Sequence, residues 1–452
     1  MAARGLLDDL ASVVGIEHVL TGDTTAAHTS DWTGRWQGEC VAVVRPASTG
    51  EVAAVVSECA RHGAVIVPQG GNTGLVGGAV PSGGTVVLST VRLSELDDLD
   101  EVTGQVTAGA GVTIARLHTA TSGTGWRYGV DFAARDSATV GGTIATNAGG
   151  HHVLRYGMTR RQVVGVEAVL ADGRVISHLG GLVKDNTGYD LAGLLCGSEG
   201  TLGVVTAARL ALVPDPGPAA VGLAGFTDLA VAMEAIGRLR RMLPGLEAAE
   251  LMLSDGMEAV GRHLGESPPL ADPVVVLVET TGGPDPVEHL ADGLGSLKGV
   301  GGTALAPDER TAASLWRWRE AHTEVINGVG LHPPHKFDVT LPLTSIAEFV
   351  PRVRAAVEAE RPGSVAWLFG HAGDGNIHVN VTGPPPEDDA VDGVVLELVA
   401  AMGGSISAEH GIGRAKRRWL ELCRSPEEIA VFRALKSALD PRGLLNPGVL
   451  LP

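Results

Sequence analysis

Short runs of β-branched residues alternate with helical stretches through the first half of the chain, from Val41 to about Val213. The segments VAVVRP, AVIVPQGG and TVVLST are rich in valine and are bounded by Gly, Pro or Ser, which is typical of short buried strands. Between them, STGEVAAVVSECARHG places apolar residues at helical spacing. This alternation predicts a domain of mixed helix and sheet over residues 1–215.

The segment PDPGP at 214–218 then predicts a linker, because its prolines can continue neither a helix nor a central strand. In the second region, 216–420, the patterns predict helices at 229–242 and 309–328 and strands at 273–280 and 336–343. We expect an α+β domain whose sheet carries helices on one face. Residues 421–452 are expected to form a helix that ends at Asp440-Pro441 and an extended segment that packs back on the first domain.

Composition limits the classes of partner. With 452 residues, two or three domains are expected, and 34 basic against 52 acidic residues give a net charge of −18. This charge argues against nucleic acid or an anionic membrane as the partner. The four cysteines form no CxxC pair, and acidic residues interrupt the apolar N-terminus, so we predict a protein without a leader sequence, located in the cytoplasm.

Three glycine-rich segments fall within the first domain, at 68–81, 137–150 and 197–206. Glycine lets backbone N–H groups approach a ligand closely and form a concave anion site, which indicates a phosphate-bearing cofactor. The first segment lacks the Gly-Lys-Ser/Thr end of a P-loop and the GxGxxG spacing. One such loop alone is equally compatible with a structural turn, whereas three together predict a cradle for a dinucleotide.

A candidate metal site lies in GHAGDGNIHVN, at 370–380, where His371 and His378 flank a Gly-Asp-Gly turn. A strand, a turn and a returning strand would bring both rings to one point. Two histidines supply only half of a metal site, and the next candidates are Glu409 and His410. The alternative is that each histidine is an ordinary hydrogen-bonded residue, with Asp374 serving as a turn former.

The segments PQGGNTGLVGG, ATVGGTIATNAGG, LRYG, KDNTGYDL and GSEGTLG, in this order, resemble the flavin-binding domain of the vanillyl-alcohol oxidase and p-cresol methylhydroxylase superfamily. The likeness extends over nearly the whole chain and is greatest to the FAD-linked D-2-hydroxyacid dehydrogenases, above all those acting on D-2-hydroxyglutarate. It implies a two-subdomain FAD-binding domain and an α+β substrate domain with an antiparallel sheet. It also implies FAD contacts from Pro68, Gln69, Gly70, Gly71, Asn72, Thr73, Gly74, Gly77, Gly78, Gly142, Thr143, Ala145, Asn147, Gly149, Glu199, Gly200, Gly203 and Val204. Some relatives carry a flavin-linked histidine where this chain has Asn72, so we expect non-covalent FAD.

The same resemblance implies that His371, His378 and Glu409 hold a divalent metal, usually zinc, and that His410 is the catalytic base. Flavin N5 would accept the hydride from C2 of the substrate. Asn380 follows His378 on the same strand face and could donate a hydrogen bond to the substrate.

Substrate choice is expected to depend on Arg319, Thr323 and Lys336, which fall where D-2-hydroxyglutarate enzymes bind the distal carboxylate. An arginine fork and a lysine charge suit that task in an acidic protein. Without the resemblance, Arg319 beside Glu320 is equally well a surface pair. Phe337 replaces a tyrosine of the relatives, which leaves D-malate and D-lactate as alternative substrates.

The electrons must leave the flavin, and the resemblance implies an electron-transfer flavoprotein or a quinone as acceptor; a homodimer is also compatible with it. Two other functions stay open. The chain could be the FAD subunit of a larger oxidase complex of the glycolate oxidase kind. It could also be a metallohydrolase, but that function would leave the three glycine segments unexplained.

Overall fold

The computed structural model describes residues 2 to 452 and divides the chain into two compact units. The first unit contains the chain up to Gly150, Tyr156–Asp215 and Glu409–Pro452. The second contains His151–Arg155 and Pro216–Ala408. The change at residue 215 coincides with the predicted linker. The return to the first unit takes place at Glu409 and not at residue 421, because the segment after Glu409 hydrogen-bonds to Glu199 and Val76 of that unit.

The first unit begins with a small sheet of order β1-β2-β4-β3, in which β2, β4 and β3 are parallel. Its core joins Leu10, Val55, Ile66 and Val86, all of which are fully buried. The helix α2 starts at the N-cap Ser48, whose side chain accepts from Glu51 N, and ends at Gly63 in the left-handed region. The elements are α1 (Ala2–Val14), η1 (Ile16–His18), β1 (Val19–Leu20), η2 (Gly22–His28), β2 (Cys40–Val44), α2 (Thr49–His62), β3 (Val65–Gln69) and β4 (Thr85–Ser89).

A second sheet of the same unit has the order β5-β9-β7-β8 and is antiparallel throughout. It has its own core, which includes Ile114, Ile144 and Leu210. Two separate cores make the two subdomains that the resemblance implied. The elements are β5 (Gln105–Gly109), α3 (Ile114–Thr121), β6 (Trp126–Arg127), α4 (Val140–Thr146), α6 (Thr159–Gln162), β7 (Val163–Val169), β8 (Val175–His178), α7 (Leu191–Leu195), β9 (Val204–Ala211) and β10 (Val213–Pro214).

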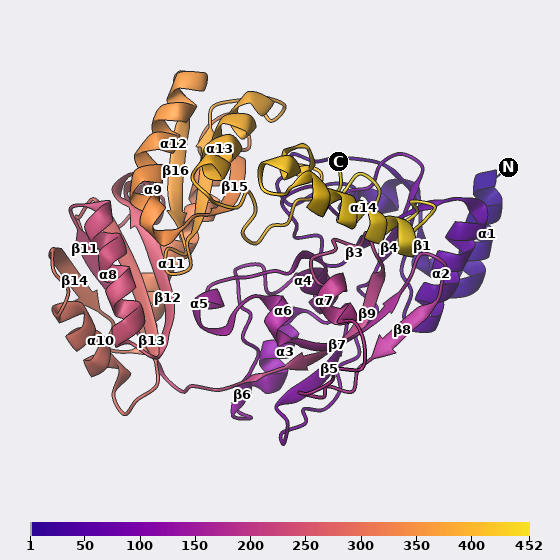
Figure 1. Ribbon diagram of the computed structural model, residues 1–452, viewed down its shortest axis with the longest axis horizontal. Helices are drawn as coiled ribbons and strands as arrows, with labels where there is room; N and C mark the ends of the chain where they lie inside the picture. Colours follow the sequence, from indigo (N-terminus) through magenta and orange to yellow (C-terminus); the bar gives the residue numbers. More distant parts are fainter. Residues whose placement is uncertain (1) are drawn as a thin grey trace. The chain divides into compact units, whose positions relative to one another are not determined.

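The C-terminal part of the first unit contains η4 (Arg417–Leu422) and α14 (Pro426–Leu439), drawn in yellow in Figure 1. A capping box between Ser425 and Glu428 starts α14, and the helix ends just before Asp440-Pro441, as predicted. The chain then runs beside β3, where the N–H of Ile66 donates to Leu444 O and that of Asn446 to Ile66 O. These hydrogen bonds extend the first sheet with the C-terminal segment.

The second unit is built on one antiparallel sheet of order β14-β11-β13-β12-β16-β17-β15, which confirms the predicted sheet (Figure 1). The short helix α5 (Val153–Tyr156) lies where the chain crosses between the units. The remaining elements are β11 (Ala219–Phe226), α8 (Leu229–Met242), β12 (Leu246–Leu253), α9 (Ser254–Leu264), β13 (Val274–Thr281), α10 (Pro286–Gly295), β14 (Val300–Leu305), α11 (Glu309–Asn327), β15 (His335–Thr340), η3 (Leu343–Ser345), α12 (Ile346–Glu360), β16 (Val365–Gly370), β17 (Asn376–Thr382) and α13 (Asp389–Ala401).

The expectation of helices on one face of this sheet is wrong. Val221 and Leu223 of β11 pack with Leu315 and Trp318 of α11. Gly222, which points to the opposite face, lies against Leu294 of α10. Every residue of β12 and β13 is buried, so both faces of these strands are covered. The sequence of such a strand does not show which elements cover each face. Among residues 2–452, no helix is long and apolar enough to cross a membrane.

The strands β16 and β17 form the predicted hairpin around the Gly-Asp-Gly turn. Phe369 pairs with His378 across it, and Asp374 Oδ1 accepts the N–H of Asn376, the role of a turn former. The strand β15 pairs with the other edge of β17, so that Lys336 lies opposite Asn380 and Asp338 opposite His378. Directly opposite residues share a face, and this sheet face therefore collects polar side chains from β15 and β17.

Candidate active site

His371 and His378 lie together at the end of the β16–β17 hairpin. Their Nε2 atoms are 3.4 Å apart, and their ring centroids are 5.1 Å apart with nearly perpendicular planes. The glycine turn reverses the strand, so an odd sequence separation no longer sends the rings to opposite faces. The predicted approach of the two imidazoles is confirmed. Two facing nitrogen atoms are the part of a metal site that this hairpin can supply.

The side chain that orients His371 is Glu250 in β12, a residue that sequence reasoning missed. Glu250 Oε1 lies 2.7 Å from His371 Nδ1, and Glu250 Oε2 accepts from Arg319 Nε at 2.7 Å. Burial by itself raises the pKa of Glu250, but the charges of His371 and Arg319 outweigh it and hold this pKa far below its usual range. The available signal was one acidic residue inside the otherwise apolar run AAELML.

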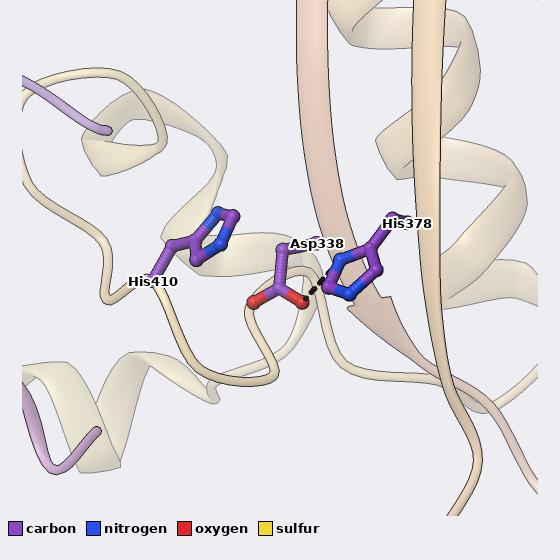
Figure 2. Close-up of side chains that lie close together, drawn as sticks. All are labelled: Asp338, His378 and His410. Carbon is purple, nitrogen blue, oxygen red and sulfur yellow. Dashed lines mark ion pairs between the residues drawn. The ribbon is translucent and has the colours of Figure 1, made fainter. Parts of the chain in front are cut away.

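Asp338 in β15 plays the same part for His378, and it was also missed. Its Oδ1 lies 3.4 Å from His378 Nδ1, the contact drawn as a dashed line in Figure 2, and accepts from Asn376 Nδ2 at 2.7 Å. Burial lowers the pKa of His378 to about 4, against the effect of Asp338. Each ring thus faces a buried carboxylate through Nδ1, which fixes its tautomer and leaves Nε2 as the atom that can bind a metal. Asp338 could have been found from its position two residues after Lys336, on the same strand face.

Arg319 is buried, with 4 % of its surface exposed, and its guanidinium lies 4.8 Å from the ring of Phe369. The alternative of a surface pair beside Glu320 is therefore wrong. Thr323 follows one turn later on α11 and is half-buried. The hydrogen bond from Arg319 to Glu250 links the predicted substrate residue to the partner of His371.

Lys336 and Asn380 lie opposite each other on β15 and β17. Burial lowers the pKa of Lys336 to about 8. Asn380 is 4 % exposed, and its Nδ2 has no hydrogen-bond partner among the described residues. A buried amide donor without a partner costs about 1–3 kcal/mol, which a bound acceptor would offset. These two side chains therefore have the chemistry to bind an anionic ligand.

His151 belongs to the second unit together with His152. Its ring lies 5.1 Å from Trp316 and 5.9 Å from His371 between centroids, while His152 Nε2 is 2.9 Å from Glu279 Oε1. Trp316 Nε1 also donates to Glu279, at 2.6 Å. Burial lowers the pKa of His151 well below its usual value, so this ring is neutral. His151 is thus a neighbour of His371 that the motifs did not predict, and Trp316 packs on its ring.

The three glycine segments converge in the first unit. A Cβ added at Gly70 would overlap Thr139, and one at Gly71 would overlap the carbonyl oxygen of Ser137, so only glycine allows the first two segments to approach. Gly200 of the third segment packs on the ring of Pro68. Around Gly74 a Cβ would meet no atom within 4 Å, which leaves room for a ligand beside the backbone.

Each glycine segment also contains one non-glycine residue in the left-handed region. These are Asn72, Asn147 and Glu199, with φ of 53°, 50° and 52°. Such residues are uncommon and concentrate at binding sites, where the surrounding structure holds them in place. Asn72 Nδ2 donates to Ser30 O at 2.8 Å, so its side chain holds the N-terminal segment while its backbone remains in the loop.

Glu409 and His410 belong to the first unit, whereas His371 and His378 belong to the second. Glu409 Oε1 accepts from the N–H of Gly150 at 2.6 Å. The following residues are held by Glu199, whose carboxylate accepts from Ile412 N and Gly413 N. Burial raises the pKa of Glu199, and these two hydrogen bonds and the charge of Lys416 oppose that rise.

Comparison with known protein families shows which family this chain belongs to. The family described as FAD linked oxidases, C-terminal domain, matches residues 216–450, more than half of the chain, and the FAD binding domain matches residues 41–178. The chain belongs to the FAD-linked oxidases. FAD is accordingly the cofactor of this FAD-linked oxidase. The matched regions include the first two glycine segments and both histidines of the hairpin.

Several curated relatives carry one name. D-2-hydroxyglutarate dehydrogenase of Xanthomonas citri pv. viticola is 39 % identical over 435 residues, which is 93 % of this chain and 91 % of the relative. The mitochondrial D-2-hydroxyglutarate dehydrogenase of Bos taurus is 38 % identical over 93 % of this chain and 79 % of its own. That of Arabidopsis thaliana is 35 % identical over 94 % and 77 %. This FAD-linked oxidase is therefore similar to them over nearly all of its length.

Solved structures show the fold. The 4-ethylphenol oxidase from Gulosibacter chungangensis superposes with a TM-score of 0.79 at 18 % identity, covering 100 % of this chain and 97 % of the other. For p-cresol methylhydroxylase the TM-score is 0.77 at 16 % identity, with coverage of 99 % and 96 %. The fold implied by the sequence motifs, a p-cresol methylhydroxylase type FAD-binding domain with an α+β substrate domain, is confirmed.

Proposed function

We propose that this FAD-linked oxidase oxidises a D-2-hydroxy acid, D-2-hydroxyglutarate to 2-oxoglutarate, with the help of a divalent metal. The observation that carries the proposal is the pair of imidazoles whose Nε2 atoms lie 3.4 Å apart. The names of the relatives in Xanthomonas citri pv. viticola and Bos taurus support the choice of substrate. The two units contribute to the reaction in different ways.

In this proposal His371, His378 and Glu409 hold the metal, zinc in the first instance. The donor set of two imidazoles and a carboxylate suits zinc, and such a catalytic site keeps one position open for substrate. The carboxylates of Glu250 and Asp338 support it, because metal-binding histidines nearly always have a partner of this kind at the second ring nitrogen. The donor chemistry therefore fits the metal.

Oxidation at C2 requires the substrate to lose a proton from its hydroxyl and a hydride from carbon. Bound FAD supplies the two-electron acceptor, and a bound divalent metal supplies a Lewis acid for the hydroxyl and carboxylate oxygens. His410 takes the hydroxyl proton, a task for which an imidazole has a suitable ordinary pKa of about 6.5. Asn380 Nδ2 donates a hydrogen bond to a substrate oxygen.

Lys336, Arg319 and Thr323 bind the distal carboxylate in this proposal. Lys336 lies opposite Asn380 in the sheet, so the two side chains are on one face. The guanidinium of Arg319 donates a hydrogen bond to Glu250, whose negative charge compensates part of the charge of Arg319. Lys336 is accordingly the main cationic contact. A dicarboxylate uses this charge, whereas D-lactate has no second carboxylate to place there.

The three glycine segments hold FAD without a covalent bond, since this chain has Asn72 at the position where some relatives carry a flavin-linked histidine. The proposed contacts to FAD are Pro68, Gln69, Gly70, Gly71, Asn72, Thr73, Gly74, Gly77, Gly78, Gly142, Thr143, Ala145, Asn147, Gly149, Glu199, Gly200, Gly203 and Val204. The proposed electron acceptor is an electron-transfer flavoprotein or a quinone.

The experiment is anaerobic reduction of the bound flavin by substrate. The reaction is followed through the loss of flavin absorbance at about 450 nm. D- and L-2-hydroxyglutarate, D-malate, D-lactate and glycolate are compared before chelation, after chelation and after zinc is restored. We expect rapid bleaching by D-2-hydroxyglutarate that chelation removes and zinc restores. Bleaching by a monocarboxylate alone would overturn the dicarboxylate, and bleaching that survives complete metal removal would overturn the metal.

A further inference from the structure

The carboxylate of Glu199, in the glycine segment 197–206, accepts two hydrogen bonds from the loop that carries His410. Its Oε1 accepts from Ile412 N and its Oε2 from Gly413 N, both at 2.8 Å. Glu199 is 8 % exposed, so water competes little for these bonds. Both oxygen atoms of one buried carboxylate are thus used on two successive backbone N–H groups.

The loop that Glu199 holds carries His410. Gly411 and Gly413 have φ of 79° and 54°, and a Cβ at Gly411 would lie 2.9 Å from Glu199 Oε1. Leu450 N donates to Gly413 O, and Arg414 N donates to Val76 O in the first glycine segment. The loop is therefore packed directly against the carboxylate, with no room for side chains at these glycines.

Glu199 is itself fixed at both backbone groups. Its N–H donates to Ala145 O at 2.8 Å, and its carbonyl oxygen accepts from Asn446 Nδ2 at 2.7 Å. Its φ of 52° is held by these contacts. On the other side of His410, Glu409 is tied to Gly150 N. The histidine is thus held between two anchors, both attached to the glycine segments.

We propose that Glu199 is a positioning residue that fixes the His410 loop to the flavin cradle through its side-chain carboxylate. The inference rests on the proposed role of His410 as the base, and it adds a positioning function to a residue that was expected only to contact FAD. Displacing a reacting group by about 1 Å can cost about 100-fold in rate, so a small movement of this loop would slow catalysis strongly.

The first variant is Glu199→Gln in the holoenzyme. The amide keeps one acceptor oxygen but turns an NH2 group toward the second backbone N–H, so one of the two bonds is lost. We expect the rate constant of flavin reduction by D-2-hydroxyglutarate, per bound FAD and at saturation, to fall by about 10- to 100-fold. The substrate concentration at half-saturation should change by less than about twofold, because the variant removes no proposed substrate contact.

Asp440→Asn is the matched control. Asp440 is 2 % exposed, and its two oxygens accept from Leu444 N and Leu445 N at 2.9 and 2.8 Å, a similar clamp at another turn of the same unit, where Oδ2 also pairs with Lys436. It should lower thermal stability while leaving the flavin reduction rate unchanged. If Glu199→Gln loses FAD or stability but reduces its remaining flavin at the normal rate, Glu199 is merely structural and the proposal is overturned.

A double-mutant cycle separates this inference from the proposed function. If Glu199 acts through His410, then Glu199→Gln should cause no further loss in a His410→Ala background. A further loss of the same size there would overturn the positioning role. An unchanged rate in His410→Ala alone would instead overturn the role of His410 as base, and the absence of bleaching in the unaltered protein would overturn the proposed substrate.

Discussion

The Nε2 atoms of His371 and His378 lie 3.4 Å apart, while Nδ1 of each ring faces a different buried carboxylate. Glu250 comes from β12 and Asp338 from β15, the strands on either side of the β16–β17 hairpin. The hairpin brings the rings together, and the neighbouring strands orient them. This division between approach and orientation leads to separate predictions.

Removing one ring should remove the metal and leave the flavin. His371→Ala deletes a proposed ligand in the second unit, whereas the glycine segments lie in the first. We expect metal content to fall below about one tenth of the normal stoichiometry and flavin reduction to fall at least about 100-fold. Elemental analysis and the flavin spectrum measure the two quantities. His332→Ala, at an exposed histidine, is the control, and a His371→Ala protein with full metal content would refute the ligand assignment.

Glu250→Gln should weaken both metal binding and folding. The neutral amide leaves Arg319 without its buried anion, and breaking such a pair costs about 3–5 kcal/mol. Loss of the carboxylate at His371 Nδ1 should lower metal affinity about 10- to 100-fold. Urea unfolding and competitive metal titration test the two effects. Glu258→Gln, at an exposed position on α9, should change neither, and equal behaviour of the two variants would contradict the role of Glu250.

The pH dependence of substrate capture should report Lys336. Its pKa is lowered to about 8 by burial, so the side chain is charged below this pH and loses its charge above it. An anionic distal carboxylate is attracted by the charged form, and kcat/KM for D-2-hydroxyglutarate should therefore fall above pH 8, by up to about tenfold per pH unit. Lys336→Arg keeps its charge and should move this fall to higher pH. The same fall with D-lactate would exclude a distal-carboxylate role.

The cofactor should come off intact. Asn72 uses its side-chain amide to hold Ser30 O and Ala27 O. An amide offers no nucleophile of the kind that links histidine to flavin. Acid denaturation should therefore release all of the yellow colour into the supernatant, where chromatography identifies FAD. Flavin that stays with the precipitated protein would show a covalent link.

Gly71→Ala should weaken FAD binding through the fold of the cradle. The added Cβ would overlap the carbonyl oxygen of Ser137, so the first and second glycine segments would have to separate. We expect loss of about 1–3 kcal/mol of stability and a lower FAD content, measured by thermal unfolding and by the ratio of flavin to protein absorbance. Gly83→Ala is the control, because a Cβ there meets no atom within 4 Å. Normal FAD content in Gly71→Ala would contradict the close approach.

Local chemistry made much of the architecture predictable. The Gly-Asp-Gly turn between two apolar strands predicted the hairpin that joins His371 and His378, and Ser48 and Gly63 bound the helix α2 where caps are expected. Such features depend on φ, on strand alternation and on capping, which act over a few residues. The glycine segments predicted a place where backbones approach closely. At Gly71 only glycine fits, because a Cβ there would overlap the carbonyl oxygen of Ser137.

By itself, the sequence determined the strand and helix pattern, the glycine cradle, the histidine hairpin and the family to which they belong. Only the tertiary structure decided that Glu250 orients His371 from 121 positions away, that both faces of the large sheet are covered, and that the chain returns to the first unit at Glu409. The reason is that strand order and the packing of helices bring distant residues together, and a buried carboxylate must find its partners across that distance to be stable.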